Sequence, residues 1–231
     1  LHNTGRRQRQ MCIRDRGEIG ASFDGDADRL IMVDENGDIV NGDLILTILS
    51  KYLSEVNQLT NNIVVSTVMS NYGFKQAIEK FNFDLIETPV GDKYVAEAMK
   101  KYDAALGGEQ SGHIIISDQL PVGDGLVTLI YVLKAMQHFG VALSDFKKEN
   151  LYEYPQKLTN LELENKLNDE ELEYINQIAL DMSIKKDLDG RYLIRNSGTE
   201  PLLRVLVEAK SNEAMEEFSN ELITKINKYL N

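Results

Sequence analysis

Residues 63–106 decide the fold and read IVVSTVMSNYGFKQAIEKFNFDLIETPVGDKYVAEAMKKYDAAL. The short apolar run Ile63–Met69 predicts a strand, and residues 71–81 follow it with the apolar spacing of a helix. Phe83–Glu87 predicts a second strand, and Lys93–Tyr102 predicts a second helix. Strands that alternate with helices of about ten or more residues are typical of βαβ units, so the sequence predicts an α/β fold on a mixed, mostly parallel sheet.

The same alternation extends on both sides of this stretch. Upstream, we expect strands at 19–23 and 30–33, a turn at Asn36-Gly37 leading to a strand at 39–40, and an amphipathic helix that Asp43 caps and that runs to about Val56. Downstream, we expect strands at 104–106 and 114–116 and a long helix at 124–139.

After the charged stretch Lys147–Asn150 the pattern changes. An extended segment at 152–163, a helix at 169–184, strands at 191–195 and 202–208, and a helix at 212–230 predict a small α+β domain. The predicted organisation is an extension at 1–16, a segment at 17–58 that carries an acidic loop, an α/β domain at 59–148 and the α+β domain at 149–231.

Charge and composition exclude several classes of function. The chain has 25 Lys and Arg against 37 Asp and Glu, a net charge of −12, so its acidic body disfavours a nucleic-acid partner. Its single cysteine, Cys12, excludes an internal disulfide and a cysteine-rich metal site. There is no apolar run of about 18 residues and no secretory signal at the start, so we expect no membrane association and a cytoplasmic location.

The opening LHNTGRRQRQMCIRDR stands apart from the rest of the chain. It holds five arginines and one aspartate, a local charge of +4. Two interpretations stay open: a basic arm that binds an anion or nucleic acid, or a non-native extension. The second is favoured, because no other part of the chain has this charge.

The sequence Phe23-Asp-Gly-Asp-Ala-Asp-Arg29 is the sharpest candidate for chemistry. Asp24, Asp26 and Asp28 alternate along a loop, so their carboxylates can converge on one hard cation. A solvated acidic turn is the alternative. A calcium EF-hand is disfavoured, because Arg29 stands where that loop needs glycine and strands flank it where helices are needed. Mg²⁺ shared with a substrate phosphate fits better, and Arg29 suits a phosphoryl oxygen.

A second candidate is Gly107-Gly-Glu-Gln-Ser-Gly-His113, between two predicted strands. Its glycines permit close approach of a ligand, and Glu109, Ser111 and His113 supply the acceptors and donors that a sugar or an amine needs. A glycine-rich turn with incidental polar residues, and a structural histidine, are the alternatives. His113 is otherwise a candidate for proton transfer.

The third candidate is Arg195-Asn-Ser-Gly-Thr-Glu-Pro201, followed by Arg204. Arginines, hydroxyls and the backbone N–H groups of a tight turn suit a phosphate group, although a plain polar turn is also consistent. Lys93, at the start of a predicted helix, offers a further cation. Metal, sugar and phosphate sites together indicate phosphoryl transfer on a sugar phosphate.

FDGDADR, GGEQSGH and RNSGTEPLLR, in this order, resemble the metal, sugar and phosphate loops of the α-D-phosphohexomutase family, over about Gly17 to Asn231. The sequences of the second and third motifs are most similar to those of bacterial members that act on glucosamine phosphates. The resemblance implies a partial second domain at 17–58, a third domain at 59–148 and a fourth domain at 149–231. It also implies a reaction that interconverts glucosamine 6-phosphate and glucosamine 1-phosphate through a phosphoserine and a 1,6-bisphosphate, on the route to UDP-N-acetylglucosamine.

The resemblance assigns roles residue by residue. It implies that Asp24, Asp26 and Asp28 hold Mg²⁺, and that Arg29 and His113 act near the reacting end. The implied substrate-binding residues are Lys93, Glu109, Ser111, Arg195, Asn196, Ser197, Gly198, Thr199 and Arg204. The implied partners are a hexosamine monophosphate and bisphosphate, with a homodimer for the full-length protein.

One departure limits what the resemblance implies. The family's phosphoserine lies in a Ser-His-Asn-Pro sequence, which these 231 residues lack, so we expect no mutase turnover from this chain alone. A mutase acting on glucose or mannose phosphates, and a non-catalytic sugar-phosphate-binding module, remain alternatives.

Overall fold

The computed structural model describes residues 19–119, 121–198 and 200–230. The chain divides into two compact units after Tyr152, and each unit is considered by itself. The predicted extension at 1–16 lies outside the described residues. The domain boundaries at 58/59 and 148/149, which the family resemblance implies, stay predictions.

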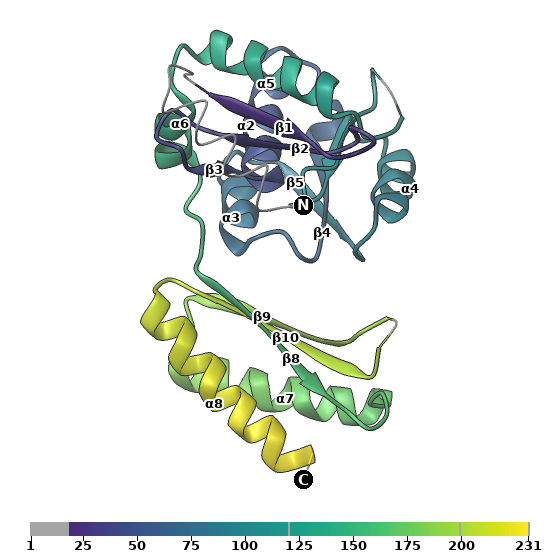
Figure 1. Ribbon diagram of the computed structural model, residues 1–231, viewed down its shortest axis with the longest axis vertical. Coiled ribbons are helices and arrows are strands. Elements are labelled where there is room, and N and C mark those ends of the chain that lie inside the picture. The colour runs from purple at the N-terminus through teal and green to yellow at the C-terminus, as the bar shows by residue number, and fades with distance from the viewer. Residues whose placement is uncertain (1–18, 120, 199, 231) are drawn as a thin grey trace. The chain divides into compact units, whose positions relative to one another are not determined.

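The first unit, the upper part of Figure 1, is built on a four-stranded sheet. Its order is β5 (Asp84–Thr88), β4 (Ile63–Thr67), β6 (Leu106–Gly108) and β7 (Ile114–Ile116). β4 runs parallel to β5 and β6, whereas β7 is antiparallel to β6. The predicted α/β fold with a mixed, mostly parallel sheet is confirmed. The strand expected at 104–106 starts later, so Gly107 belongs to β6 rather than to a loop.

Helices cover both faces of this sheet because its central strand is apolar on both sides. α2 (Gly42–Glu55), α3 (Tyr72–Lys80), α5 (Gly125–Phe139) and α6 (Leu143–Asn150) share one core, and α4 (Asp92–Tyr102) belongs to another. Val64 packs in the first core, and its neighbour Val65 packs with Val95 and Met99 of α4. Successive side chains of a strand point to opposite faces, so one apolar run serves both helix layers.

Two details of the first unit differ from the expectations. Helix α2 is buried on nearly all sides over Gly42–Ser50, so it is a core helix rather than an amphipathic one. Its N-cap is Asn41, whose side chain accepts from the Leu44 N–H, and Asp43 lies inside the first turn. Helix α6 includes the charged stretch Lys147–Asn150, for which no helix was expected. Only Leu143 and Phe146 of this helix are buried, so its sequence has too few apolar residues to show a helical period.

A small antiparallel sheet precedes α2. It consists of β1 (Gly20–Phe23), β2 (Leu30–Val33) and β3 (Ile39–Val40), and the predicted turn at Asn36-Gly37 joins the last two. Leu30, Met32 and Val40 pack in the same core as α2. A short 3₁₀ helix, η1 (Thr60–Asn62), leads from α2 toward β4.

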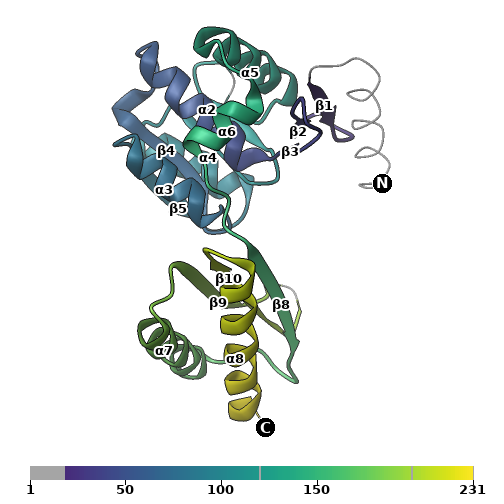
Figure 2. The ribbon, with the colours of Figure 1, turned by 90° about the vertical axis from the view of Figure 1, so that its left-hand side faces the viewer.

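The second unit is the predicted α+β domain. β8 (Gln156–Glu162), β10 (Leu202–Ala209) and β9 (Gly190–Asn196) form an antiparallel sheet in that order. α7 (Asp169–Lys186) and α8 (Asn212–Leu230) cover one face of it (Figures 1 and 2). Leu203, Val205 and Val207 point to the helices, so the intervening Arg204 and Leu206 belong to the opposite face.

No single helix in the described part of the chain is long and apolar enough to cross a membrane. Only α5 and α6 taken together, at an angle of 78°, reach that length and composition.

Candidate functional site

The acidic loop lies between β1 and β2, as the sequence predicts. Asp24, Asp26 and Asp28 each offer a ligand atom, and these atoms lie within 4.8 Å of one another. Ala27 adopts a φ of 60°, which bends the chain so that the aspartates converge. The Ala27 carbonyl accepts from the Gly125 N–H at 2.9 Å, so the start of α5 fixes the loop.

The glycine-rich segment is a tight hairpin between β6 and β7. The Glu109 N–H donates to the His113 carbonyl, and the Gly112 N–H donates to the Glu109 carbonyl, both at 2.9 Å. The Leu30 N–H of β2 donates to the Gly112 carbonyl at 3.0 Å, and Arg29 and His113 form an antiparallel bridge. The two candidate segments, about 80 residues apart in sequence, are therefore joined directly through their backbones.

His113 is the side chain that connects these segments. It is 7% exposed, and its Nε2 lies 3.6 Å from Asp28 Oδ2. Its Nδ1 is buried, and so is Asp28 Oδ1; neither atom has a hydrogen-bond partner among the described residues. Arg29 Nε lies 3.7 Å from Asp24 Oδ2 and 3.9 Å from Asp28 Oδ1. Asp28 therefore lies close to both a buried imidazole and a half-exposed guanidinium.

Electrostatics distinguishes Asp28 and Glu109 from ordinary surface acids. Burial, a hydrogen bond with Asp24 and the charges of Asp24 and Asp26 raise the pKa of Asp28. Burial is also the main cause that raises the pKa of Glu109, and the charges of His113 and Arg29 partly oppose it. Glu109 thus lies within the electrostatic field of both residues that join the acidic loop to the hairpin.

The raised pKa of Glu109 predicts a pH-dependent difference between the wild type and Glu109→Gln. A carboxyl group whose pKa is raised by folding stabilises the folded state below its unfolded pKa, about 4.3, and this contribution is lost as pH rises through the raised value. We expect the wild type to lose stability relative to Glu109→Gln from about pH 4.3 upward, until Glu109 is fully ionised. Thermal unfolding midpoints of both proteins over that range test this, and parallel curves would contradict it.

The third candidate lies in the second unit, between β9 and β10. Arg195 and Arg204 are directly opposed across the two strands. Burial first, and then the charge of Arg204, lower the pKa of Arg195. Opposed like charges destabilise a strand pair, and an anion between them would relieve the repulsion.

A buried hydroxyl group lies next to this arginine pair. Ser197 is 2% exposed, and neither its Oγ nor Arg204 Nε has a hydrogen-bond partner within the described chain. Among the described residues, the Arg204 guanidinium lies 4.0 Å from the Glu200 carboxylate. A buried guanidinium nitrogen and a buried hydroxyl group without hydrogen-bond partners among the described residues suit an anionic ligand.

The other residues predicted to bind substrate differ in their exposure and in their contacts. The Asn196 amide holds Leu167 on both sides, donating to its carbonyl at 2.8 Å and accepting from its N–H at 3.2 Å, so this side chain supports the loop. Gly198 and Ser111 are exposed. The Lys93 side chain is 75% exposed and lies 3.8 Å from Glu97. Thr199 lies outside the described residues.

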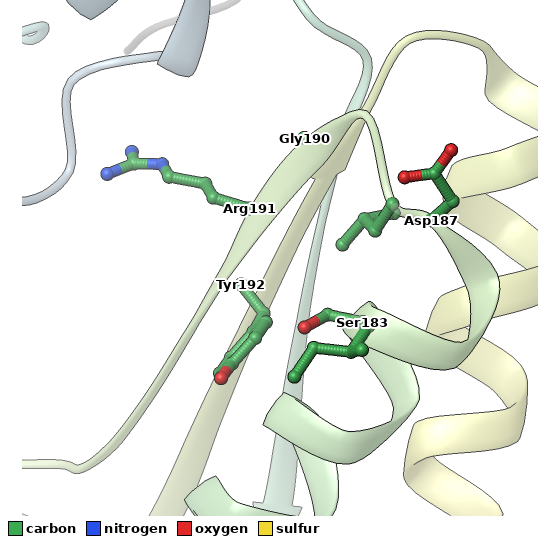
Figure 3. A pocket seen from close by; sticks show the side chains of 7 residues that line it. Ser183, Asp187, Gly190, Arg191 and Tyr192 are labelled. Atoms are coloured by element: carbon green, nitrogen blue, oxygen red, sulfur yellow. The ribbon is translucent and has the colours of Figure 1, made fainter.

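A surface hollow of about 280 Å³ lies elsewhere in the second unit, between α7 and β9 (Figure 3). Its lining residues are Ser183, Ile184, Asp187, Leu188, Gly190, Arg191 and Tyr192. Arg191 points away from Ser183 and Tyr192 and pairs with the buried Glu208. No predicted site residue lines this hollow, so it does not mark the candidate site.

Two residues of the site were not predicted from the sequence. Asp43 accepts from Gln110 of the hairpin, and Gly123 packs so closely on the His113 ring that a Cβ there would overlap it. An aspartate just before an apolar run fits the pattern of a helix cap, so the sequence predicts that role for Asp43 rather than a contact with the hairpin. No pattern in the sequence marks Gly123.

Two family models match most of the chain. Phosphoglucomutase/phosphomannomutase alpha/beta/alpha domain III matches residues 41–154, and the C-terminal domain of the same family matches residues 158–225. The match of domain III begins at α2, which agrees with the packing of this helix in the core of the first unit.

Individual relatives point to the same family. The chain is 49% identical to a phosphoglucosamine mutase of Streptococcus agalactiae over 90% of its length, and 48% identical to one of Streptococcus gordonii. These matches cover 47% and 46% of the relatives, so the chain spans about half their length. A structure of Aspergillus fumigatus N-acetylphosphoglucosamine mutase with GlcNAc-6P and magnesium has a TM-score of 0.73 at 22% identity, over 91% of this chain and 52% of that one. The chain belongs to the phosphoglucomutase/phosphomannomutase family, the α-D-phosphohexomutases, of which it contains the third and C-terminal domains.

Proposed function

We propose that this chain is the sugar- and phosphate-binding part of a phosphoglucosamine mutase, which interconverts glucosamine 6-phosphate and glucosamine 1-phosphate. The observation that carries the proposal is the direct joining of the acidic loop to the hairpin through Arg29, Leu30 and His113. Phosphoryl transfer needs a cation site next to the group that recognises the sugar, and this junction provides that arrangement. The identity of 49% to a phosphoglucosamine mutase supports the choice of sugar.

The acidic loop fits Mg²⁺. Three carboxylates within 4.8 Å and a buried Asp28 oxygen that lacks a hydrogen-bond partner among the described residues match the oxygen ligands that this ion prefers. Bound there, Mg²⁺ would neutralise charge on a phosphoryl group. Asp24, Asp26 and Asp28 are the residues that would hold it.

Three side chains of the first unit then have distinct roles in the proposal. Arg29 would donate to phosphoryl oxygens, because its guanidinium is half exposed beside the aspartates. Glu109 would accept from the sugar amine, and Ser111 from a hydroxyl group. His113 would hold or move a proton at the reacting oxygen, because its Nε2 already lies beside Asp28.

The second unit would bind the phosphate group that does not react. Arg195, Arg204 and Ser197 supply two guanidinium groups and a hydroxyl group on one short segment of the sheet. Gly198 would contribute a backbone N–H, and Asn196 would hold the loop through Leu167. The substrates of this proposal are a hexosamine monophosphate and the corresponding bisphosphate.

Calorimetric titration of the 231-residue chain with glucosamine 6-phosphate in Mg²⁺ tests the proposal. We expect binding, and we expect Arg195→Ala to weaken it about tenfold or more, because a charge-assisted hydrogen bond contributes about 1.5–3 kcal/mol. Arg191→Ala is not a suitable control because Arg191 pairs with buried Glu208, so exposed Lys228→Ala serves as the matched loss of charge. Absence of binding by the wild type, or equal affinity in Arg195→Ala, would contradict the proposal.

Titration with other sugars separates this mutase from its relatives. Glucosamine 6-phosphate carries an amine where glucose 6-phosphate carries a hydroxyl group, and a half-buried carboxylate such as Glu109 favours the amine. We expect about a tenfold preference for the aminosugar, and its loss in Glu109→Gln. Tighter binding of glucose or mannose 6-phosphate by tenfold would favour those substrates.

A further inference from the structure

Behind the hairpin lies a buried carboxylate that the proposed function does not use. Asp43 is 1% exposed and lies in the first turn of α2. It does not cap the helix, because Asn41 already accepts from the Leu44 N–H at 3.1 Å. Burying a charge is costly unless it is hydrogen-bonded, so the partners of Asp43 indicate what it does.

Two partners of its Oδ2 atom come from two different loops. Asp43 Oδ2 accepts from the Asn71 N–H at 2.8 Å and from the Gln110 side-chain amide at 3.1 Å. Asn71 caps α3, and Gln110 lies in the hairpin. The positive end of the α2 dipole favours an anion at this position. One carboxylate oxygen therefore joins the starts of two helices to the hairpin.

Gln110 is held at both ends. Its carbonyl accepts from the Gly42 N–H at 3.0 Å, and its side chain donates to Asp43. A Cβ on Gly42 would overlap the Glu109 carbonyl oxygen, so α2 abuts the hairpin directly. Gln110 stands between Glu109 and Ser111, the two residues proposed to read the sugar. Their orientation consequently depends on how residue 110 is fixed.

A second set of hydrogen bonds supports the base of the hairpin. Ser66 Oγ donates to the Gly108 carbonyl at 3.1 Å, and the hydroxyl groups of Ser66 and Ser70 are hydrogen-bonded to each other. Ser70 directly precedes Asn71, whose N–H reaches Asp43. Two sets of hydrogen bonds, connected through the backbone of Ser70 and Asn71, thus restrict the ends of β4 and β6 and the start of α2.

We propose that Asp43 is a positioning residue that fixes the hairpin through Gln110 and thereby sets affinity for the sugar. The inference rests on the proposed function for its ligand but not for its geometry. It predicts that loss of the Asp43 carboxylate loosens residues 109–112 and weakens binding of glucosamine 6-phosphate while the phosphate-binding segment of the second unit is unaffected.

The experiment compares Asp43→Ala, Asp43→Asn and Gln110→Ala with Ser50→Ala. Ser50 is also buried on α2, and its hydroxyl group donates to the Thr47 carbonyl of the same helix. Amide hydrogen exchange of Gly42 and Gly112 reports on the hairpin, and calorimetry reports affinity for glucosamine 6-phosphate and for inorganic phosphate. We expect Asp43→Ala and Gln110→Ala to speed exchange about tenfold and to weaken sugar-phosphate binding about tenfold, with phosphate binding unchanged. Asp43→Asn, which keeps an acceptor oxygen, should rescue both to within about threefold.

Each outcome bears on the inference separately from the proposed function. Wild-type exchange and affinity in Gln110→Ala, whose side chain is only partly buried, would overturn the inference even if Asp43→Ala unfolds. Equal losses in Ser50→Ala would also overturn it. Faster exchange in a chain whose wild type binds no glucosamine 6-phosphate would support the positioning role and contradict the proposed function.

Discussion

Affinity for Mg²⁺ is expected to fall at least about 100-fold when Asp26 and Asp28 are both replaced by asparagine. The cluster offers three carboxylates within 4.8 Å, and the substitution leaves one. Affinity of an oxygen-ligand site depends on the number of charged ligands, and every 1.4 kcal/mol, roughly, is a factor of ten. Calorimetric titration with Mg²⁺ measures the change directly.

Without metal, the same double variant is expected to be more stable than the wild type. Like charges at about 4 Å repel by about 4 kcal/mol at an effective dielectric of about 20, and exposure of the loop reduces this value. The variant should therefore unfold at a higher temperature in EDTA, and the wild type should gain more from added Mg²⁺, since a ligand stabilises only the state that binds it.

Asp38→Asn, in the neighbouring turn, is the matched control because it removes an exposed carboxylate outside the cluster. It should leave Mg²⁺ affinity unchanged. Unaltered affinity in the double variant, or a lower unfolding temperature in EDTA, would show that the three aspartates form a solvated turn rather than a cation site.

The acidic loop was predictable because its three carboxylates are close together in the sequence. Asp24, Asp26 and Asp28 lie within five residues, so one bend of the chain at Ala27 suffices to bring them together. The parallel sheet was predictable for a similar reason, since the apolar runs and the helical spacing between them are short-range patterns.

The junction of loop and hairpin was not predictable in the same way. Arg29 and His113 are far apart in sequence, and only the path of β2 beside the hairpin brings them together. The resemblance to a family supplied that expectation, whereas no pattern in the residues did. Asp43 shows the opposite failure: an aspartate before an apolar run fits the N-cap pattern, but Asn41, two residues earlier, takes that position and leaves Asp43 to the loops.

Replacement of Gly112 by alanine is expected to destabilise the first unit by more than about 3 kcal/mol. Gly112 has a φ of +94°, which L side chains rarely adopt, and a Cβ there would overlap the Leu30 carbonyl oxygen. Strained backbone of this kind costs about 1–3 kcal/mol, and the overlap adds to it because both partners are backbone atoms. Urea unfolding of wild type and variant measures the change.

Gly37→Ala separates the two causes. Gly37 has a similar φ of +85°, but nothing lies within 4 Å of a Cβ built there, so it should show the conformational cost alone. If Gly112→Ala is no more destabilising than Gly37→Ala, the contact between the hairpin and β2 can yield at little cost, and the junction is not rigid.

The functional consequence follows from the hydrogen bond at the same position. The Gly112 carbonyl accepts from the Leu30 N–H at 3.0 Å, and His113, the next residue, places its Nε2 3.6 Å from Asp28. A side chain that forces Gly112 away from Leu30 therefore also moves His113 away from the aspartates. Gly112→Ala should consequently weaken Mg²⁺-dependent binding of glucosamine 6-phosphate, whereas Gly37→Ala should not, because its turn joins β2 to β3 rather than to the hairpin.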